Sequence, residues 1–200
     1  IESALEAFRG EIEQVPPMYS AIKQDGQPLY KLAREGLEVE RKARRVLIKR
    51  LELRAFRPGD RPEADIYLEC SKGTYVRSIA VDLGSALGCG AHVSALRRTM
   101  AGPFGLENSV SLTTLEALKK NGQTDEMDAL LMPADIAVQG MPVVRLSESG
   151  GFYMRQGQPV MVPNAPCSGM GRVALESGEF LGVGEILDDG RVAPRRLIVT

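Results

Sequence analysis

The chain has 200 residues, a formal net charge of −1 and 44% hydrophobic residues, which is an ordinary composition for a folded globular protein. No apolar run approaches the roughly 20 residues that a membrane-spanning helix requires, so we expect no membrane association. The three cysteines form no CxxC pair, which favours neither a zinc site nor a disulfide framework and fits a reducing cytoplasm. The single histidine, His92, argues against a histidine-rich metal site.

Apolar residues at the start of the chain have helical spacing. Ile1, Leu5, Phe8 and Ile12 lie on one helical face, with Gly10 near the expected end. The sequence thus begins inside a predicted helix and without a start methionine. We therefore expect it to be a fragment of a longer protein.

The next segment combines an extended stretch with a hairpin. Pro16 and Pro17 disfavour a helix and predict extended structure, whereas residues 29–34 fit a short helix that ends at Gly36. Apolar and charged residues alternate over 45–57 and again over 64–71, with a Pro-Gly-Asp turn between them. These two strands are expected to pair antiparallel.

The second of these strands leads through Lys72-Gly73-Thr74 into a predicted helix over 74–87, whose first turn carries Tyr75 and Arg77. Lys72 and Arg77 would lie at the positive end of the helix dipole, where cations are disfavoured. A phosphate or a buried carboxylate nearby would offset this cost. A nucleotide-phosphate loop is a further interpretation of Lys72-Gly73-Thr74, but the spaced glycines of a P-loop are missing.

The remaining elements suggest a second, smaller domain. We predict a strand over 92–104 that ends at Gly102-Pro103, and helices over 111–120 and 125–131. Beyond Met141 the pattern predicts a helix and five short strands, over 147–156 and over 143–146, 159–162, 170–176, 179–187 and 191–199. We therefore predict an α+β fold with a mixed or antiparallel sheet over 1–140, and a small β-barrel over 141–200.

Basic residues gather in three clusters despite the near-neutral net charge. They lie between Lys31 and Arg61, at Arg97 and Arg98, and at Arg191, Arg195 and Arg196. Such clusters favour contact with a phosphate backbone, although solvated faces of mixed charge are the ordinary alternative. Because aromatic residues are few, base stacking would fall to single tyrosines such as Tyr19 and Tyr30.

Several motifs, in order along essentially the whole chain, resemble the bacterial tRNA pseudouridine-55 synthase family (pseudouridine synthase B). They are Val15-Pro16-Pro17-Met18-Tyr19-Ser20-Ala21-Ile22-Lys23, Leu29-Tyr30, Ala33-Arg34, Cys70 to Arg77, Gly88 to His92, Leu96-Arg97-Arg98 and Gly182 to Leu197. The resemblance implies a catalytic domain truncated at its N-terminus over 1–140 and an RNA-binding barrel of the PUA type over 141–200. It also implies a monomeric isomerase without cofactor or metal, whose partner is the T-stem and loop of tRNA. The target uridine would be flipped out and its C–N glycosidic bond cleaved.

The same resemblance implies roles for individual residues. Tyr75 and Arg77 would be catalytic, with Arg77 holding an essential aspartate in its ionised form. Tyr19 would stack on the flipped base, Leu96 would close the apolar wall of the pocket, and Lys72 and Tyr30 would contact the substrate. The remaining RNA contacts would be Lys23, Arg34, His92, Arg97, Arg98, Arg195 and Arg196.

The family's Gly-x-Leu-Asp-Pro motif, which carries the catalytic aspartate, does not occur in this sequence. Asp82 is the aspartate nearest to Tyr75 and Arg77, but it lies nearly two helical turns beyond Tyr75. We therefore expect the chain alone to be inactive. A non-catalytic tRNA-binding protein or RNA chaperone is the alternative, in which the two tyrosines are packing residues and Arg77 forms an ordinary surface ion pair.

Overall fold

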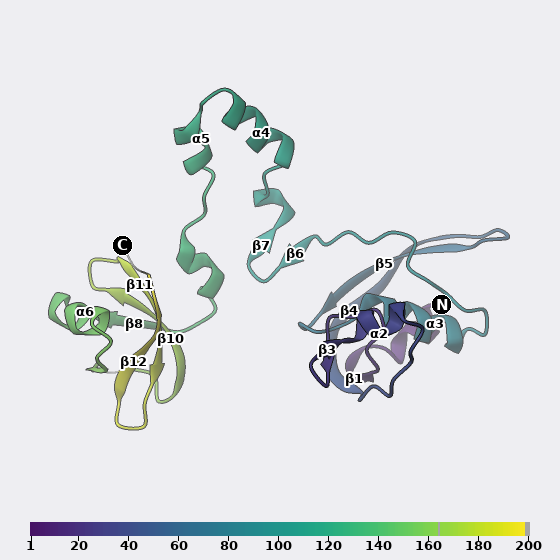
Figure 1. The fold of residues 1–200 in the computed structure, drawn as a ribbon, viewed down its shortest axis with the longest axis horizontal. Helices are drawn as coiled ribbons and strands as arrows, with labels where there is room; N and C mark the ends of the chain where they lie inside the picture. The colour runs from purple at the N-terminus through teal and green to yellow at the C-terminus, as the bar shows by residue number, and fades with distance from the viewer. Residues whose placement is uncertain (164, 199–200) are drawn as a thin grey trace. The chain divides into compact units, whose positions relative to one another are not determined.

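The structure is a computed structural model that describes residues 1–163 and 165–198. Its backbone contacts divide the chain into two compact units, Ile1–Leu96 and Arg97–Thr200. Figure 1 shows the elements of each unit, which we describe separately.

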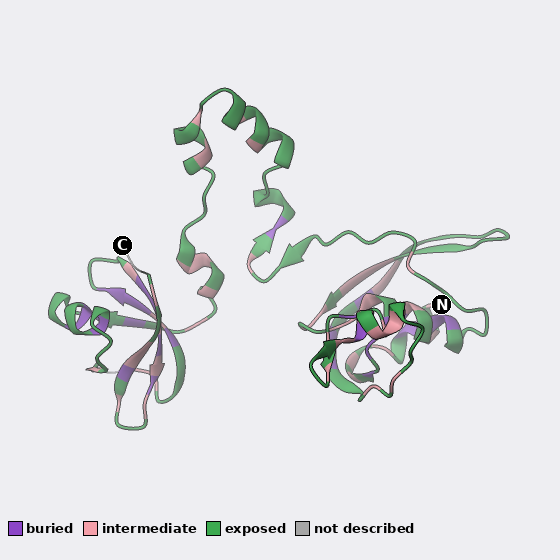
Figure 2. Ribbon diagram, viewed as in Figure 1, coloured by how far each residue is buried: buried purple, intermediate pink, exposed green. Residues whose placement is uncertain are grey.

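The first unit is built on a three-stranded antiparallel sheet in the order β1-β4-β5. The strands are β1 (Gly10–Gln14), β4 (Arg44–Arg57) and β5 (Glu63–Cys70), and they are accompanied by α1 (Glu2–Glu6) and α3 (Val76–Ala86). Apolar residues of α1, β4 and α3 form one buried cluster: Leu5, Val46, Ile48, Leu51, Ile79 and Leu83. Figure 2 colours the buried parts of this unit purple. The predicted hairpin of residues 45–57 and 64–71 is confirmed.

The segment between β1 and β4 contains a short hairpin and a short helix. Strands β2 (Lys23–Gln24) and β3 (Gln27–Pro28) pair with each other, and α2 (Leu29–Arg34) has the bounds predicted from the sequence. The hairpin turn contains Asp25, whose φ of 50° lies in the left-handed region.

The prediction of one N-terminal helix reaching Gly10 is wrong. The helix α1 ends at Glu6, and Ile12 lies in β1 opposite Val46 of β4. Glutamates flank Ile12 on both sides, so the period-two pattern and the partner strand determine the structure here. Gly10, with φ of 83°, allows the chain to change direction before the strand.

The predicted strand over 92–104 is also wrong. Residues 91–99 form no helix or strand, and only the two-residue strands β6 (Met100–Ala101) and β7 (Phe104–Gly105) follow. They pair with each other across Gly102-Pro103, so the predicted stop is in fact a hairpin turn. A single-turn 3₁₀ helix, η1 (Leu106–Asn108), comes next.

Helices α4 (Leu112–Lys120) and α5 (Thr124–Asp128) confirm the two predicted helices. The Ser111 hydroxyl accepts a hydrogen bond from the Thr114 amide at 3.0 Å and so caps α4 as the sequence indicates. A second 3₁₀ helix, η2 (Ala134–Val138), leads to the C-terminal sheet.

The C-terminal part is a five-stranded mixed sheet in the order β8-β10-β11-β12-β9. Its elements are β8 (Val143–Leu146), α6 (Glu148–Arg155), β9 (Val160–Met161), β10 (Gly169–Leu175), β11 (Phe180–Ile186) and β12 (Arg191–Leu197). Strands β8 and β10 are parallel and the other pairs antiparallel. The five predicted strands and the helix are confirmed; the last strand was predicted to reach residue 199, which lies outside the described residues. The α+β class is thus confirmed.

Candidate active site

A short extended segment crosses the start of α3 and carries Tyr19. We call residues 14–20 the strap. Pro16 and Pro17 keep the strap out of helical conformation, as predicted. Two side chains of α3 bind its backbone: the Ser78 hydroxyl donates to the Val15 carbonyl at 3.0 Å, and Arg77 Nη2 donates to the Tyr19 carbonyl at 2.7 Å.

The strap is held by residues outside α3 as well. Arg41 Nη1 donates to the Pro16 carbonyl at 3.2 Å, and the Tyr30 amide at the start of α2 donates to the Ser20 carbonyl at 3.0 Å. Tyr19 is 57% exposed, although the residue beside it, Ser20, is buried. The backbone of Tyr19 is therefore fixed while its aromatic face is available to a ligand.

Tyr75 lies at the N-terminal end of α3 and precedes its first helical residue. The prediction that Tyr75 belongs to the first turn is thus slightly wrong: it is the N-cap, with extended φ and ψ of −101° and 107°. A turn through Gly73, with φ of 85°, delivers the chain to this position. Ser71 anchors the turn on β4, because its amide donates to the Leu47 carbonyl at 2.8 Å and its hydroxyl accepts from the Leu47 amide at 3.0 Å.

Arg77 is the exposed cation of this site. It lies in the first turn of α3, where the helix dipole disfavours positive charge. The Tyr19 carbonyl supplies a partial negative charge, so part of the expected compensation comes from the backbone. Within residues 1–163 and 165–198 no carboxylate forms an ion pair with Arg77; Asp82 is exposed on α3 and forms none with any residue.

The other predicted substrate and RNA contacts differ in how they relate to Tyr19, Tyr75 and Arg77. Tyr30 is tied to the strap by its backbone, and its ring is covered by the Arg34 guanidinium at 5.4 Å. Lys72 is exposed in the turn before α3. His92 and Leu96 lie on the irregular segment after α3, where Leu96 is 67% exposed, and their predicted roles stay predictions.

Many arginines of the predicted basic stretch are neutralised by neighbouring carboxylates. Glu52 pairs with both Arg50 and Arg54, and these two guanidinium groups flank the Tyr67 ring at 5.1 and 5.0 Å. The hydrogen bond and charge of Arg50 hold the pKa of Glu52 below its usual range. This cluster, which sequence reasoning missed, links adjacent strands of the β4–β5 hairpin. The basic stretch is thus not one uniform cationic surface.

The predicted RNA contacts divide in the same way. Arg195 pairs with Glu185, and its neighbour in the third cluster, Arg191, pairs with Asp189 at 2.7 Å. In contrast, the other six predicted RNA contacts form no ion pair with a carboxylate among the described residues: Lys23, Arg34, His92, Arg97, Arg98 and Arg196.

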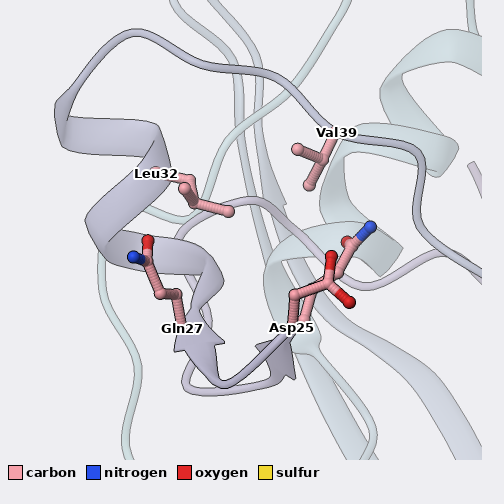
Figure 3. Close-up of a pocket in the computed structure, with 5 residues that line it drawn as sticks. Asp25, Gln27, Leu32 and Val39 are labelled. Atoms are coloured by element: carbon pink, nitrogen blue, oxygen red, sulfur yellow. The ribbon is translucent and has the colours of Figure 1, made fainter.

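Two pockets of the structure are lined by residues other than those predicted for the site. A pocket of about 260 Å³ lies between the β2–β3 hairpin and α2, lined by Gln24, Asp25, Gln27, Leu32 and Val39. Figure 3 shows its polar side, at Asp25 and Gln27, facing Leu32 and Val39. In the second unit, Arg145, Phe180 and the Arg172–Asp135 ion pair line another pocket of about 210 Å³.

No group of three or more potential metal ligands gathers within the part of the chain that the structure describes. Among the same residues, no helix is long and apolar enough to cross a membrane. The candidate site therefore consists of two tyrosines, one arginine and the backbone groups that join them.

Three family models match consecutive parts of the chain. They are the N-terminal domain of TruB family pseudouridylate synthases over residues 1–76, the C-terminal domain of tRNA pseudouridylate synthase B over 77–139, and the C-terminal domain of pseudouridine synthase II TruB over 142–198. The chain belongs to the TruB family. The first model ends at Val76 and the second begins at Arg77, at the site described above.

Curated relatives of high identity support this assignment. The tRNA pseudouridine synthase B of Pseudomonas aeruginosa (strain UCBPP-PA14) is 56% identical over 198 residues, which cover 99% of this chain and 64% of the relative. The protein of the same name from Ectopseudomonas mendocina (strain ymp) is 55% identical over 200 residues. The chain therefore spans less than two thirds of the length of these TruB relatives.

Chains of two solved complexes have a similar fold. A chain of a Cbf5-Nop10-Gar1 complex superposes with a TM-score of 0.74 at 23% identity, covering 98% of this chain and 60% of that one. A chain of an H/ACA RNP bound to a substrate RNA containing 2′-deoxyuridine gives 0.73 at 20% identity, covering 100% of this chain and 60% of that one. At these identities the likeness shows the fold alone.

Proposed function

We propose that this chain forms part of a tRNA pseudouridine synthase that isomerises uridine 55 in the T-loop. The observation that carries the proposal is the hydrogen bond from Arg77 Nη2 to the Tyr19 carbonyl. Arg77 follows Tyr75 by two residues. The hydrogen bond brings a cation and the backbone of an exposed aromatic residue together in a family of pseudouridylate synthases. The names of the TruB relatives supply the tRNA substrate.

In the proposed reaction the uridine leaves the RNA stack, at a cost of a few kcal/mol, and its base stacks on the Tyr19 ring. The N1–C1′ bond breaks, the base turns, and a C5–C1′ bond forms. The proton on C5 is lost to solvent and N1 gains a proton, so the atoms balance. Tyr75, at the N-cap of α3, lies beside the base and ribose.

Arg77 would hold the carboxylate that assists cleavage of the N1–C1′ bond. Its bond to Tyr19 uses one nitrogen of the planar guanidinium, which leaves further N–H groups for a carboxylate. A cation that pairs with a carboxylate lowers its pKa and so keeps it ionised near neutral pH. We propose that the carboxylate comes from a segment other than these 200 residues, because none of their aspartates lies in a Gly-x-Leu-Asp-Pro motif.

The C-terminal sheet would supply an RNA-binding surface of the PUA type for the T-stem. Arg196 of β12, which has no carboxylate partner among the described residues, supports this role because it can contact a phosphate. We propose a monomeric enzyme that acts in the cytoplasm. The predicted boundary near residue 141 stays a prediction.

The test is tritium release from tRNA labelled at C5 of uridine. The polypeptide encoded by the whole open reading frame that contains this sequence is expected to release one tritium per tRNA, because C5 loses its proton in the isomerisation. Binding of tRNA without release would contradict the proposal. It would instead support a non-catalytic tRNA-binding protein or RNA chaperone. Such a protein is also consistent with Arg77 having no carboxylate partner among the described residues.

The 200-residue chain alone provides a second measurement. We expect it to bind tRNA but to release no tritium above the protein-free background. Release at a rate comparable to that of the longer polypeptide would show that the carboxylate lies within this chain and would overturn that part of the proposal.

A further inference from the structure

Gln14, the last residue of β1, is a buried polar residue that neither the sequence motifs nor the proposed chemistry uses. Its side chain is only 2% exposed. The amide Nε2 donates to the Tyr75 carbonyl at 3.1 Å, and Oε1 accepts from the Tyr75 amide at 2.7 Å. One side chain thus satisfies both backbone groups of a proposed catalytic residue.

The bond to Gln14 Oε1 gives the Tyr75 N–H a partner, whereas the Tyr75 carbonyl also accepts hydrogen bonds from the Ser78 and Ile79 amides at 3.1 and 3.3 Å. Tyr75 is the N-cap of α3, and because the first N–H groups of a helix have no intrahelical acceptor, its own N–H has no partner within the helix. The Gln14 amide presents a donor and an acceptor side by side, as the backbone of an adjacent β-strand would. The Gln14 side chain therefore joins the end of β1 to the start of α3.

Gln14 is also the first residue of the strap that leads to Tyr19. Its backbone is fixed by antiparallel pairing opposite Arg44 of β4. From this fixed point, the side chain sets the position of Tyr75, and the chain runs on through Val15 to Tyr19. Further along α3, the side chains of Ser78 and Arg77 bind the strap backbone at Val15 and Tyr19.

We propose that Gln14 is a positioning residue that fixes Tyr75 relative to Tyr19 and Arg77 for the reaction. This inference rests on the proposed function. Removing the amide would leave the fold largely intact but loosen the tyrosine at the start of α3. Since a displacement of about 1 Å can cost about a hundredfold in rate, the loss should appear in catalysis rather than in tRNA affinity.

The test uses Gln14→Met, which keeps the length of the side chain but neither hydrogen bond, in the polypeptide of the whole reading frame. We expect the single-turnover rate of tritium release at saturating tRNA to fall about 10- to 100-fold. The Kd for tRNA should stay within about threefold. Amide hydrogen exchange at Tyr75 should become faster, because its N–H loses its acceptor.

The matched control is Arg9→Met, which removes another side-chain-to-backbone bond of the same unit, from Arg9 Nε to the Leu51 carbonyl at 3.1 Å. The control should leave the release rate and Tyr75 exchange unchanged. A Gln14→Met rate within threefold of wild type, an equal rate loss in Arg9→Met, or unchanged exchange at Tyr75 would each overturn the positioning role.

If Gln14→Met does not fold, Gln14→Glu carries the test, since it keeps the acceptor and loses the donor. An unaltered release rate in Gln14→Glu overturns the inference. A reduced rate with retained tRNA affinity supports it.

Failure of the two proposals can be told apart. A wild-type polypeptide that releases no tritium overturns the proposed function and with it the catalytic purpose of this contact. Normal wild-type release together with normal release by Gln14→Met overturns the inference on Gln14 alone.

Discussion

At the scale of single residues, the partner of an arginine distinguishes its role in this chain. Arg77 donates to a backbone carbonyl and has no ion pair among the described residues, whereas Arg57 forms two hydrogen bonds to Asp65, each of 2.7 Å. Arg57 also pairs with Glu63 across the β4–β5 hairpin. Both residues are arginines, but Arg77 lies at the proposed site and has no carboxylate partner among the described residues.

The Arg57 pairing leads to a prediction on titration. The hydrogen bonds and charge of Arg57 hold the pKa of Asp65 below its ordinary 3.8, so the stabilisation is complete above that value and is lost as the pH falls below it. Arg57→Met should therefore raise the pKa of Asp65 toward its ordinary value, as followed by NMR of the side-chain carboxyl carbon. Glu52 serves as the internal control, since Arg50 and Arg54 still pair with it. An unchanged pKa of Asp65 would refute the pairing.

The place of Tyr75 and Arg77 at the start of a helix was predictable because the local pattern, a strand followed by a glycine turn and a helix, is continuous in the chain. Their catalytic roles come from the family resemblance and stay predictions. Sequence reasoning could not find Gln14, because a polar residue at the end of an alternating strand looks like a solvent-facing position. The Tyr67 cluster was missed for a similar reason: it depends on which residues of β4 face β5, and that register is set by the whole hairpin.

At the scale of elements, α3 also fixes the segment that carries His92 and Leu96. Gly84 is buried in α3, and its carbonyl accepts hydrogen bonds from the amides of Cys89 and Gly90 at 3.1 and 3.0 Å. A Cβ atom at Gly84 would clash with the backbone of Gly90 and Ala91. The glycine therefore permits the close approach of this loop to the helix.

Gly84→Ala should displace the loop and lower the free energy of unfolding by about 1–3 kcal/mol, the usual cost of overpacking. Thermal or urea unfolding measures this change. Gly140→Ala is the control, since a Cβ there meets no atom within 4 Å and the glycine has no positive φ. Equal stability of the Gly84 and Gly140 variants would contradict the packing described for α3.

Most elements were predictable because their patterns are local. The exact bounds of α2 and the cap of α4 follow from neighbouring residues. The failures at Ile12 and at residues 92–104 have a common origin, since a strand forms only where a partner strand exists. The sequence alone does not show that β1 has such a partner in β4 whereas residues 92–99 have none.

At the scale of the whole molecule, charge pairing distinguishes among the basic residues that were predicted to contact RNA. Arg195 and Arg196 are adjacent in β12 and both are exposed, which a regular strand would place on opposite faces. The register shifts here: Val183 lies opposite Arg196, and Gly184 lies opposite Pro194, which leaves Arg195 as the extra residue of a bulge. Arg195 is neutralised by Glu185, and Arg196 has no such partner among the described residues.

Arg196→Ala is accordingly expected to weaken tRNA binding and to reduce the slope of log K against log salt by about one. Arg195→Ala is the matched control and should change both quantities less, because its charge is already paired. Fluorescence titrations at several salt concentrations measure both. A larger effect of Arg195→Ala than of Arg196→Ala would show that the pairing does not govern RNA contact.

The most direct test of the account concerns Arg77, because the proposed site depends on its guanidinium. Tritium release and tRNA binding should be measured together for Arg77→Ala in the polypeptide of the whole reading frame. We predict that release is abolished while the Kd for tRNA stays within about tenfold of wild type, since the catalytic carboxylate loses the cation that orients it. Retained release accompanied by a large loss of tRNA binding would contradict the account and make Arg77 an ordinary RNA contact.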